Sequence, residues 1–467
     1  MVIINKNMIK ISIARFLYLI FLRFYYFCIQ YKLNTLKIFT NNCNDMKIKR
    51  LIVRGLFHTF DHEIRFNNGG VVIIIGENGI GKTTLLQIIN SIFTKKFDFL
   101  FSIDFDSIEI DFTEVVWIIK KEKNGLNITN QKINKNFIIK PIDERNGPFF
   151  HRHLMQIDDD KWLDRRIGRV FTREELINRF GYDPLDLSTK TPEWIETFIK
   201  ENRVLFIQTQ RLYKTDHERD RDYSSLKYMI KDYSEELVKL LQQNNTLFTA
   251  KSIQLDSTFP IRLLKVLKSS KKDFNQKIDE IIDEINSLNT YRNLLSSVGI
   301  IDRQDDDFIS KSLNTIVDNP TALSILDLYI SDNKQKLDVF RDTAKKLEIL
   351  LEIINKRFKH KKLCIDKQEG FKVKSNYEDR DISVEKLSSG EQNELIIFYT
   401  LLFKTNNNDI VLIDEPEISL HIAWQQQLID DLREIANETG VSLLISTHSP
   451  DIIGNNWSLV QALSSRE

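Results

Sequence analysis

Residues 71–93 read VVIIIGENGIGKTTLLQIINSIF. The first five form a β-branched run, which is typical of a strand buried on both faces of a sheet. The last nine continue as an apolar helix, and Gly76 to Thr84 between them contain the pattern G-x-x-x-x-G-K-[ST], which ends at Thr83. In a strand–loop–helix context this pattern indicates a loop that holds phosphate groups. We therefore predict an α/β fold built around a nucleotide-binding loop.

The chemistry of this loop gives its residues separate expected roles. Glycines let backbone N–H groups wrap phosphate oxygens, Lys82 reaches the β- and γ-phosphates, and the Thr83 hydroxyl binds Mg²⁺. The residues predicted to contact ATP are Gly76, Glu77, Asn78, Gly79, Ile80, Gly81, Lys82, Thr83 and Thr84.

A second buried strand, DIVLIDEPE (409–417), ends in two adjacent carboxylates, Asp414 and Glu415. At the carboxyl edge of a parallel strand, beside a phosphate loop, Asp414 can hold Mg²⁺. Glu415 can then orient or deprotonate the attacking water. A third buried strand, VSLLIST (441–447), ends at His448, which we expect to sense the γ-phosphate.

A further turn, EKLSSGEQNE (385–394), opens the apolar helix LIIFYTLLF. Free N–H groups and the positive dipole end at a helix mouth suit an anion. The same residues also fit an ordinary N-cap, with Ser388 or Ser389 capping and Glu391 in the first turn. The turn alone does not separate these two interpretations.

Taken in order, GENGIGKTT, LSSGEQ, LIDEPEISLH and ISTHSP resemble the ATP-binding-cassette ATPases of the structural-maintenance and recombination type. LSSGEQ resembles the family signature, LIDEPE its Walker B strand, Glu417 to His421 its D-loop and His448 its switch histidine. The resemblance implies an α/β, ABC-type P-loop NTPase head with a mixed sheet and an inserted helical, short coiled-coil subdomain.

The resemblance also implies partners. Two heads would sandwich two ATP molecules in a homodimer or higher homo-oligomer. The signature residues Ser388, Ser389, Gly390 and Glu391 would then complete the nucleotide site of the opposite subunit.

Two positions are less well defined. The strand-like run VLFIQTQRLY (204–213) offers Gln208 or Gln210 as the glutamine that senses the metal and the γ-phosphate. Strand alternation places both on one face, so both remain candidates, and Arg211 is a candidate partner for phosphate or an acid. Gly55 to His58 depart from the Asn-Phe-Arg-Ser-like run of many recombination-type heads, so we assign no base contact there.

The long middle of the chain contains two heptad-like apolar seams. Antiparallel pairing of these seams predicts a short coiled-coil hairpin with 298–332 as a partly helical tip, although two ordinary amphipathic core helices would show the same spacing. The first seam comprises Phe274, Ile278, Ile281, Ile285 and Leu288, and the second Leu337, Phe340, Ala344, Leu347, Leu351 and Ile354. The expected domains are a doubtful extension (1–45), the first part of the head (46–215), the helical insertion (216–362) and the second part of the head (363–467).

The first 45 residues contain the apolar run IARFLYLIFLRFYYFCIQ (13–30), interrupted by Arg15 and Arg23. A membrane helix and a secretory signal are both weak interpretations of this run. We expect the globular protein to begin at Met46 and residues 1–45 to represent translated upstream DNA, with a peripheral membrane anchor as the main alternative.

Composition is that of an ordinary globular chain. The 467 residues are 42% hydrophobic with a formal net charge of zero, so no global field attracts nucleic acid or membrane. The three cysteines form no C-x-x-C pair, which argues against a zinc site or a disulfide scaffold and fits a reducing, cytoplasmic location.

Among ATP-binding-cassette proteins, a head with a short helical projection resembles bacterial ATPases of the overcoming-lysogenization-defect and RecF kind. The run from LSSGEQ to STHSPDIIGNNW looks especially like ATPases of anti-phage defence systems of the PARIS, Septu and retron-associated types. This resemblance implies a sensor or switch that controls a separate, nuclease-type effector.

Two other functions remain alternatives. A RecF-like repair or replication ATPase would bind DNA directly, through basic clusters such as KSSKK (268–272) and KRFKHKK (356–362). A transporter ATPase subunit is the weakest alternative, because transporter heads lack a long coiled insertion before the signature.

Overall fold

The structure is a computed structural model. It describes residues 48–66, 70–112, 115–123, 125–139, 154–158, 161–164, 168–172, 174–176, 191–208, 213–215, 226–269, 277–302, 320–377 and 380–463. The expectations for residues 1–45, Phe274, Gln210 and Arg211 lie outside the described residues.

The strands are β1 (Ile48–Leu56), β2 (Phe60–Arg65), β3 (Val71–Ile75), β4 (Ser107–Phe112), β5 (Val116–Glu122), β6 (Gly125–Asn130), β7 (Lys135–Ile139), β8 (Leu154–Asp158), β9 (Lys161–Asp164), β10 (Arg169–Thr172), β11 (Val204–Ile207), β12 (Tyr213–Thr215), β13 (Leu226–Tyr228), β14 (Lys361–Asp366), β15 (Gly370–Ser375), β16 (Asp381–Ile382), β17 (Ile410–Asp414), β18 (Ser442–Ser446) and β19 (Val460–Ala462). The α-helices are α2 (Lys82–Phe93), α3 (Asp98–Ser102), α5 (Glu193–Glu201), α6 (Met229–Ser269), α7 (Lys277–Ser297), α9 (Pro320–Leu337), α10 (Arg341–Arg357), α11 (Ser389–Phe403), α12 (Ile422–Thr439) and α13 (Pro450–Ile453). The short 3-10 helices are η1 (Asp338–Phe340), η2 (Val384–Lys386) and η3 (Trp457–Leu459).

A five-stranded sheet in the order β11-β17-β18-β3-β19 forms the centre of the head. All four strand pairs are parallel, so the carboxyl ends of the strands meet at one edge. Strands β3 and β17 read VVIII and IVLID, and their almost complete burial explains their unbroken apolar runs.

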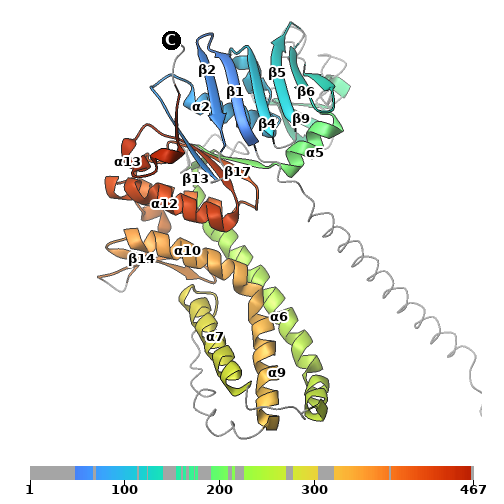
Figure 1. The fold of residues 1–467 in the computed structure, drawn as a ribbon, viewed down its shortest axis with the longest axis vertical. Coiled ribbons are helices and arrows are strands. Elements are labelled where there is room, and N and C mark those ends of the chain that lie inside the picture. The colour runs from blue at the N-terminus through green and yellow to red at the C-terminus, as the bar shows by residue number, and fades with distance from the viewer. Residues whose placement is uncertain are drawn as a thin grey trace, which may run out of the picture.

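Helix α2 lies between this sheet and a second, antiparallel sheet in the order β2-β1-β4-β5-β6-β7. Leu85, Ile88 and Ile92 of α2 share one apolar cluster with residues of both sheets, such as Ile74 of β3 and Ile108 of β4. Figure 1 shows the antiparallel sheet at the end of the head farthest from the long helices. The phosphate-loop helix is therefore fixed on two sides.

The opposite face of the parallel sheet packs on α11 and α12. Leu395 of α11 and Leu428 of α12 belong to the same cluster as Ile73 and Ile413 of the sheet. The predicted α/β head, in which parallel and antiparallel strands combine with a helical insertion, is confirmed by this arrangement.

Helices α6, α7 and α9 form an arm that projects from the head (Figure 1). Their arrangement differs from the predicted two-helix hairpin. Helix α9 begins at Pro320, inside the segment expected to be a tip, and packs against both α6 and α7. Proline is favoured in the first turn of a helix, and the apolar residues Leu323 and Ile330 of α9 are buried with Ile281 and Ile285 of α7.

The second predicted seam instead continues from α9 through η1 into α10 and enters the head core. Phe340 and Leu347 are almost fully buried there. Within the described part of the chain, no helix combines the length and the apolarity that a membrane crossing requires.

Candidate functional site

The Lys82 side chain lies inside the loop formed by residues 76–81. Its Nζ donates to the carbonyl oxygens of Gly76 at 2.8 Å and Glu77 at 3.0 Å. Burial lowers the pKa of Lys82, and the carboxylates of Glu415, Asp414 and Glu417 oppose that effect. The ammonium is thus held against a carboxylate-rich edge of the sheet, and its charge is directed at the loop interior.

The loop ends at Gly81, the N-cap of α2, with φ of 99°. This left-handed conformation favours glycine, and a Cβ on Gly81 would meet Leu56 at 2.7 Å. No side chain caps α2, and no acidic residue occupies its first turn. Its N–H groups and positive dipole end are therefore suited to an anion.

The His62 side chain contacts the phosphate loop at Ile80, and the sequence analysis did not predict this contact. The buried ring donates from Nε2 to the Ile80 carbonyl at 2.8 Å, and burial lowers its pKa. His62 lies on β2, 18 residues from Ile80, so only the folded arrangement brings them together. No local motif would have revealed the contact.

Asp414 lies at the end of β17 and is almost fully buried. The Thr83 hydroxyl donates to Oδ1 at 3.1 Å and Oδ2 at 3.0 Å, and the Ser446 hydroxyl also donates to Oδ1. Parallel pairing of β17 with β18 sets Asp414 opposite Ser446. Mg²⁺ prefers oxygen ligands, so this hydroxyl–carboxylate pair fits that ion.

Glu415 is held in an unusual backbone conformation, with φ of 45°. Its N–H donates to the Ser446 carbonyl at 3.0 Å, which anchors the residue to β18. Left-handed conformations of non-glycine residues are strained and concentrate at functional sites. The side chain is only partly buried and points toward His448, with Oε1 3.6 Å from Nε2.

His448 connects Glu415 with Lys82. Its Nδ1 lies 3.3 Å from the Lys82 Nζ. An ammonium group only donates, so Nδ1 accepts and Nε2 of the neutral ring carries the proton that faces Glu415. Side chains from the phosphate loop and from the ends of β17 and β18 therefore meet at one place.

Glu417 fixes the position of His448. Its Oε1 accepts hydrogen bonds from the Thr447 hydroxyl at 2.6 Å and from the His448 N–H at 3.0 Å. The sequence analysis placed Glu417 only in the D-loop. The signal for this second role is an acid three residues beyond Asp414, at the edge where β18 also ends.

Ser388 and Glu391 form a complete capping box at the start of α11. The Ser388 side chain accepts from the Glu391 N–H, and the Glu391 carboxylate accepts from the Ser388 N–H at 2.8 Å. Glu391 also pairs with Lys361 at 2.8 Å. The N-cap interpretation is therefore correct for Ser388, whereas Ser389 is the first residue of the helix and is exposed.

Gly390 packs tightly against the D-loop segment, because a Cβ there would lie 2.3 Å from the Ser419 carbonyl. Among the described residues, no hydrogen bond or ion pair joins 388–391 to 76–84. The two predicted parts of the nucleotide site are therefore not brought together within one chain by such contacts.

Gln208 follows β11, one residue beyond the Ile207–Ile413 pair. This register places it level with Asp414 on the neighbouring strand. Because Gln210 lies outside the described residues, the choice between the two glutamines stays open.

The sequence profile of the AAA ATPase domain family matches residues 46–453. The chain belongs to the AAA ATPase domain family. The match includes the phosphate loop, the signature, Asp414, Glu415 and His448.

Curated relatives of this AAA ATPase include ATP-binding proteins of importers. The ribose import ATP-binding protein RbsA of Clostridium tetani is 20% identical over 464 residues, which cover 84% of this chain and 87% of that protein. The phosphonates import ATP-binding protein PhnC of Staphylococcus aureus is 33% identical over 89 residues, which cover 19% of this chain and 32% of the relative. With the family match, these relatives identify the AAA ATPase as an ABC-like enzyme that hydrolyses ATP.

Solved structures similar to this AAA ATPase include two SMC heads. The Pyrococcus furiosus Smc head domain, with an extended coiled coil and bound to the C-terminal domain of ScpA, is 14% identical, with a TM-score of 0.35 over 90% of this chain and 96% of that one. The Thermotoga maritima SMC head domain is 11% identical, with a TM-score of 0.31 over 90% of this chain and 95% of that one.

Proposed function

We propose that ATP binds at the phosphate loop and is hydrolysed with Glu415 as the general base. The observation that carries this proposal is the convergence of Lys82, Glu415 and His448 through contacts of 3.3 Å and 3.6 Å at the carboxyl edge of the parallel sheet. The residues of the loop from Gly76 to Thr84 hold the phosphates, with Gln208 or Gln210 as the sensing glutamine.

Each side chain of the site has a separate role in this proposal. Lys82 and the N–H groups at the start of α2 stabilise the negative charge of the β- and γ-phosphates. Glu415 takes a proton from the attacking water while the bond between the γ-phosphorus and the β-phosphate oxygen breaks, which yields ADP and phosphate. Bound Mg²⁺, held by Thr83 and Asp414, would neutralise phosphate charge. His448, oriented by Glu417, holds Glu415 and Lys82 in position.

We further propose that two heads pair around ATP. In this arrangement, Ser388, Ser389, Gly390 and Glu391 face the γ-phosphate of the opposite subunit. The exposed Ser389 at the mouth of the 15-residue helix α11, with no bond to the phosphate loop of its own chain, supports this arrangement. We also propose the division of the chain into the four domains expected from the sequence, with the helical insertion at 216–362.

For the cellular role, we propose a sensor or switch that controls a separate, nuclease-type effector in anti-phage defence. The support is the sequence resemblance from LSSGEQ to STHSP together with the short arm. In the alternative, a RecF-like repair ATPase, KRFKHKK (356–362) would contact DNA. However, Arg357 is buried against Glu394 and Asp431, and Lys361 pairs with Glu391. Two of the five cations in this cluster, Arg357 and Lys361, are therefore engaged within the fold, whereas Lys356, Lys359 and Lys362 are exposed.

A Glu415→Gln variant tests the proposed chemistry. The amide can hold the water but cannot accept its proton, so we expect turnover to fall by about 10²–10⁴ while ATP stays bound. The measurement is steady-state phosphate release together with an ATP-binding titration and light scattering for paired heads. Glu434→Gln, an exposed change on α12, is the matched control. Turnover within threefold of the wild type in Glu415→Gln would exclude Glu415 as the base.

A further inference from the structure

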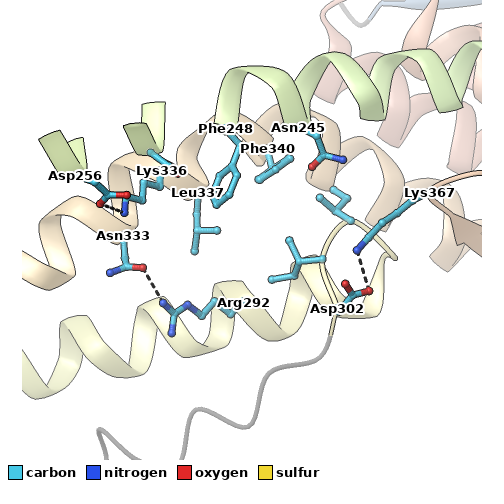
Figure 2. A pocket seen from close by; sticks show the side chains of 13 residues that line it. Asn245, Phe248, Asp256, Arg292, Asp302, Asn333, Lys336, Leu337, Phe340 and Lys367 are labelled. Carbon is cyan, nitrogen blue, oxygen red and sulfur yellow. Dashed lines mark hydrogen bonds and ion pairs between the residues drawn. The ribbon is translucent and has the colours of Figure 1, made fainter. Parts of the chain in front are cut away.

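A cavity of about 390 Å³ lies in the arm, apart from the phosphate loop (Figure 2). Protein interiors leave few voids larger than one water molecule, and sites for small organic ligands begin at roughly 300 Å³. The lining comes from α6, α7, α9, η1, the turn after Val298, and Lys367 in the turn between β14 and β15. The cavity therefore has the size of a ligand site and lies where the arm meets the head.

The middle of the cavity is apolar. Phe248 and Phe340 lie with ring centroids 5.4 Å apart and their planes tilted by 35°. Leu337, Ile300 and Ile301 complete this surface, and Figure 2 shows Phe248, Leu337 and Phe340 grouped between the polar ends. Such a surface suits a flat ring or a short hydrocarbon chain.

Cations lie at both ends of the apolar surface. Lys336 pairs with Asp256 at 2.7 Å, and Lys367 pairs with Asp302 at 2.8 Å (Figure 2). The lysine side chains are only 19% and 34% exposed, whereas those of the aspartates are 65% and 94% exposed. The cations therefore lie inward, and their present partners lie toward solvent.

This asymmetry favours an anionic ligand. Ion pairs with solvent-exposed carboxylates contribute little stability, so exchanging Asp256 or Asp302 for a ligand anion costs little. A desolvated anion next to an ammonium group forms a stronger, charge-assisted hydrogen bond. The Ser252 hydroxyl, which also lines the cavity, is buried without a hydrogen-bond partner among the described residues and offers one further polar contact.

We propose that this cavity binds a small amphipathic anion, namely an apolar ring or chain that carries a carboxylate, sulfonate or phosphate group. A molecule held there contacts Phe340, at the break between α9 and α10, and Lys367 of the head. The site is independent of the roles proposed for Lys82 and Glu415, so the nucleotide chemistry and this binding can fail separately.

The test uses the full chain and two fluorescent probes with one ring system. Anilinonaphthalene sulfonate carries the anion, and phenylnaphthylamine lacks it. We expect saturable binding of the sulfonate probe at one site per chain. The double variant Lys336→Gln/Lys367→Gln should weaken that binding by about tenfold or more, because two charge-assisted contacts are lost, and should leave phenylnaphthylamine affinity nearly unchanged.

Two further variants locate the site. Lys334→Gln removes an equivalent charge from α9 outside the cavity, where Lys334 pairs with Glu284, and should change neither affinity. Ser252→Phe places a ring in the cavity and should weaken both probes, provided that its circular dichroism and melting temperature match the wild type. Absence of saturable binding overturns the proposal. The proposal is also overturned if the affinity for the sulfonate probe is unchanged in both the double variant and Ser252→Phe. The same holds if Lys334→Gln reduces that affinity as much as the double variant does.

Discussion

Lys82 is the residue on which ATP affinity should depend most directly. Its ammonium group is the only side-chain cation within residues 76–84, and the loop carbonyls of Gly76 and Glu77 hold it in place. We expect Lys82→Ala to abolish ATP binding in a calorimetric titration. Lys95→Ala removes a lysine just beyond the other end of α2, where it pairs with Glu196, and should bind ATP normally. Unchanged affinity in Lys82→Ala would show that ATP binds elsewhere.

A second residue-level prediction concerns Glu394, which is fully buried on α11. Burial raises its pKa from 4.5 to about 8, although Arg357 opposes the shift and Asp431 and Glu391 add to it. The folded protein therefore keeps a proton that the unfolded chain releases above pH 4.5. Since the folded state binds more protons, stability decreases as pH rises from about 4.5 to 8.

Glu394→Gln removes this titration because the amide resembles the protonated acid. Between about pH 6 and pH 8, which is roughly the range set by the shifted pKa, we expect the melting temperature to fall less in the variant than in the wild type. Both melting temperatures are measured in buffers of equal ionic strength. Glu434→Gln should follow the wild type. A variant that loses more stability than the wild type as pH rises would mean that Arg357 keeps Glu394 ionised.

The position of an individual site residue was predictable from the sequence where it belongs to a motif. Contacts that form only in the folded chain were not predictable. The loop pattern points to Lys82 and Thr83, and the strand end points to Asp414. His62 below Ile80 and Lys361 beside Glu391 follow from tertiary packing of segments 18 and 30 residues apart. No local propensity encodes such contacts.

At the scale of elements, the head strands were predictable because buried parallel strands are continuous apolar runs. Helix α9 was not predictable in this way, because the first heptad seam ends at Leu288 and the second begins only at Leu337. The side chains of α9 alternate between two neighbours, α6 and α7, and a helix with two contact faces has no single heptad stripe.

An ion pair with a buried carboxylate joins α6 and α9. Arg262 donates from both Nη atoms to Asp332, with Nη2 and Oδ2 2.7 Å apart, and the Asp332 side chain is only 6% exposed. We expect Arg262→Met to speed amide hydrogen exchange in the arm by about tenfold, because an unpaired buried carboxylate favours local opening. The head should exchange as in the wild type.

The control for this change restores charge balance. Arg262→Met/Asp332→Asn removes both charges and should return arm exchange most of the way to the wild-type rate. Lys334→Gln, which breaks an exposed pair between α9 and α7, should have almost no effect. Equal protection in Arg262→Met and the wild type would show that the contact between α9 and α6 does not depend on the Arg262–Asp332 pair.

At the scale of the whole molecule, the placement of LSSGEQ bears on how many chains one nucleotide site needs. In the proposed site, Lys82, Thr83 and the loop amides hold ATP from one chain, while Ser389 is exposed on α11 and Gly390 packs on the D-loop. If the signature serves a neighbour, a bulky cation at Ser389 should leave ATP binding to one chain intact. It should nevertheless prevent ATP-dependent pairing and hydrolysis, because the signature would meet the γ-phosphate only across the interface.

Mixing two inactive variants separates this arrangement from a signature that acts within its own chain. Ser389→Arg chains keep an intact phosphate loop, and Lys82→Ala chains keep an intact signature, so each mixed dimer should contain one working composite site. We expect hydrolysis to recover partly on mixing, to at most about half of the wild-type rate per dimer in a two-site enzyme whose sites act independently. Subunit exchange is followed separately with fluorescently labelled chains, and each variant alone is the control. If mixing never restores hydrolysis despite exchange, or if Ser389→Arg alone loses ATP binding as a monomer, residues 388–391 act only as a helix cap or within their own chain.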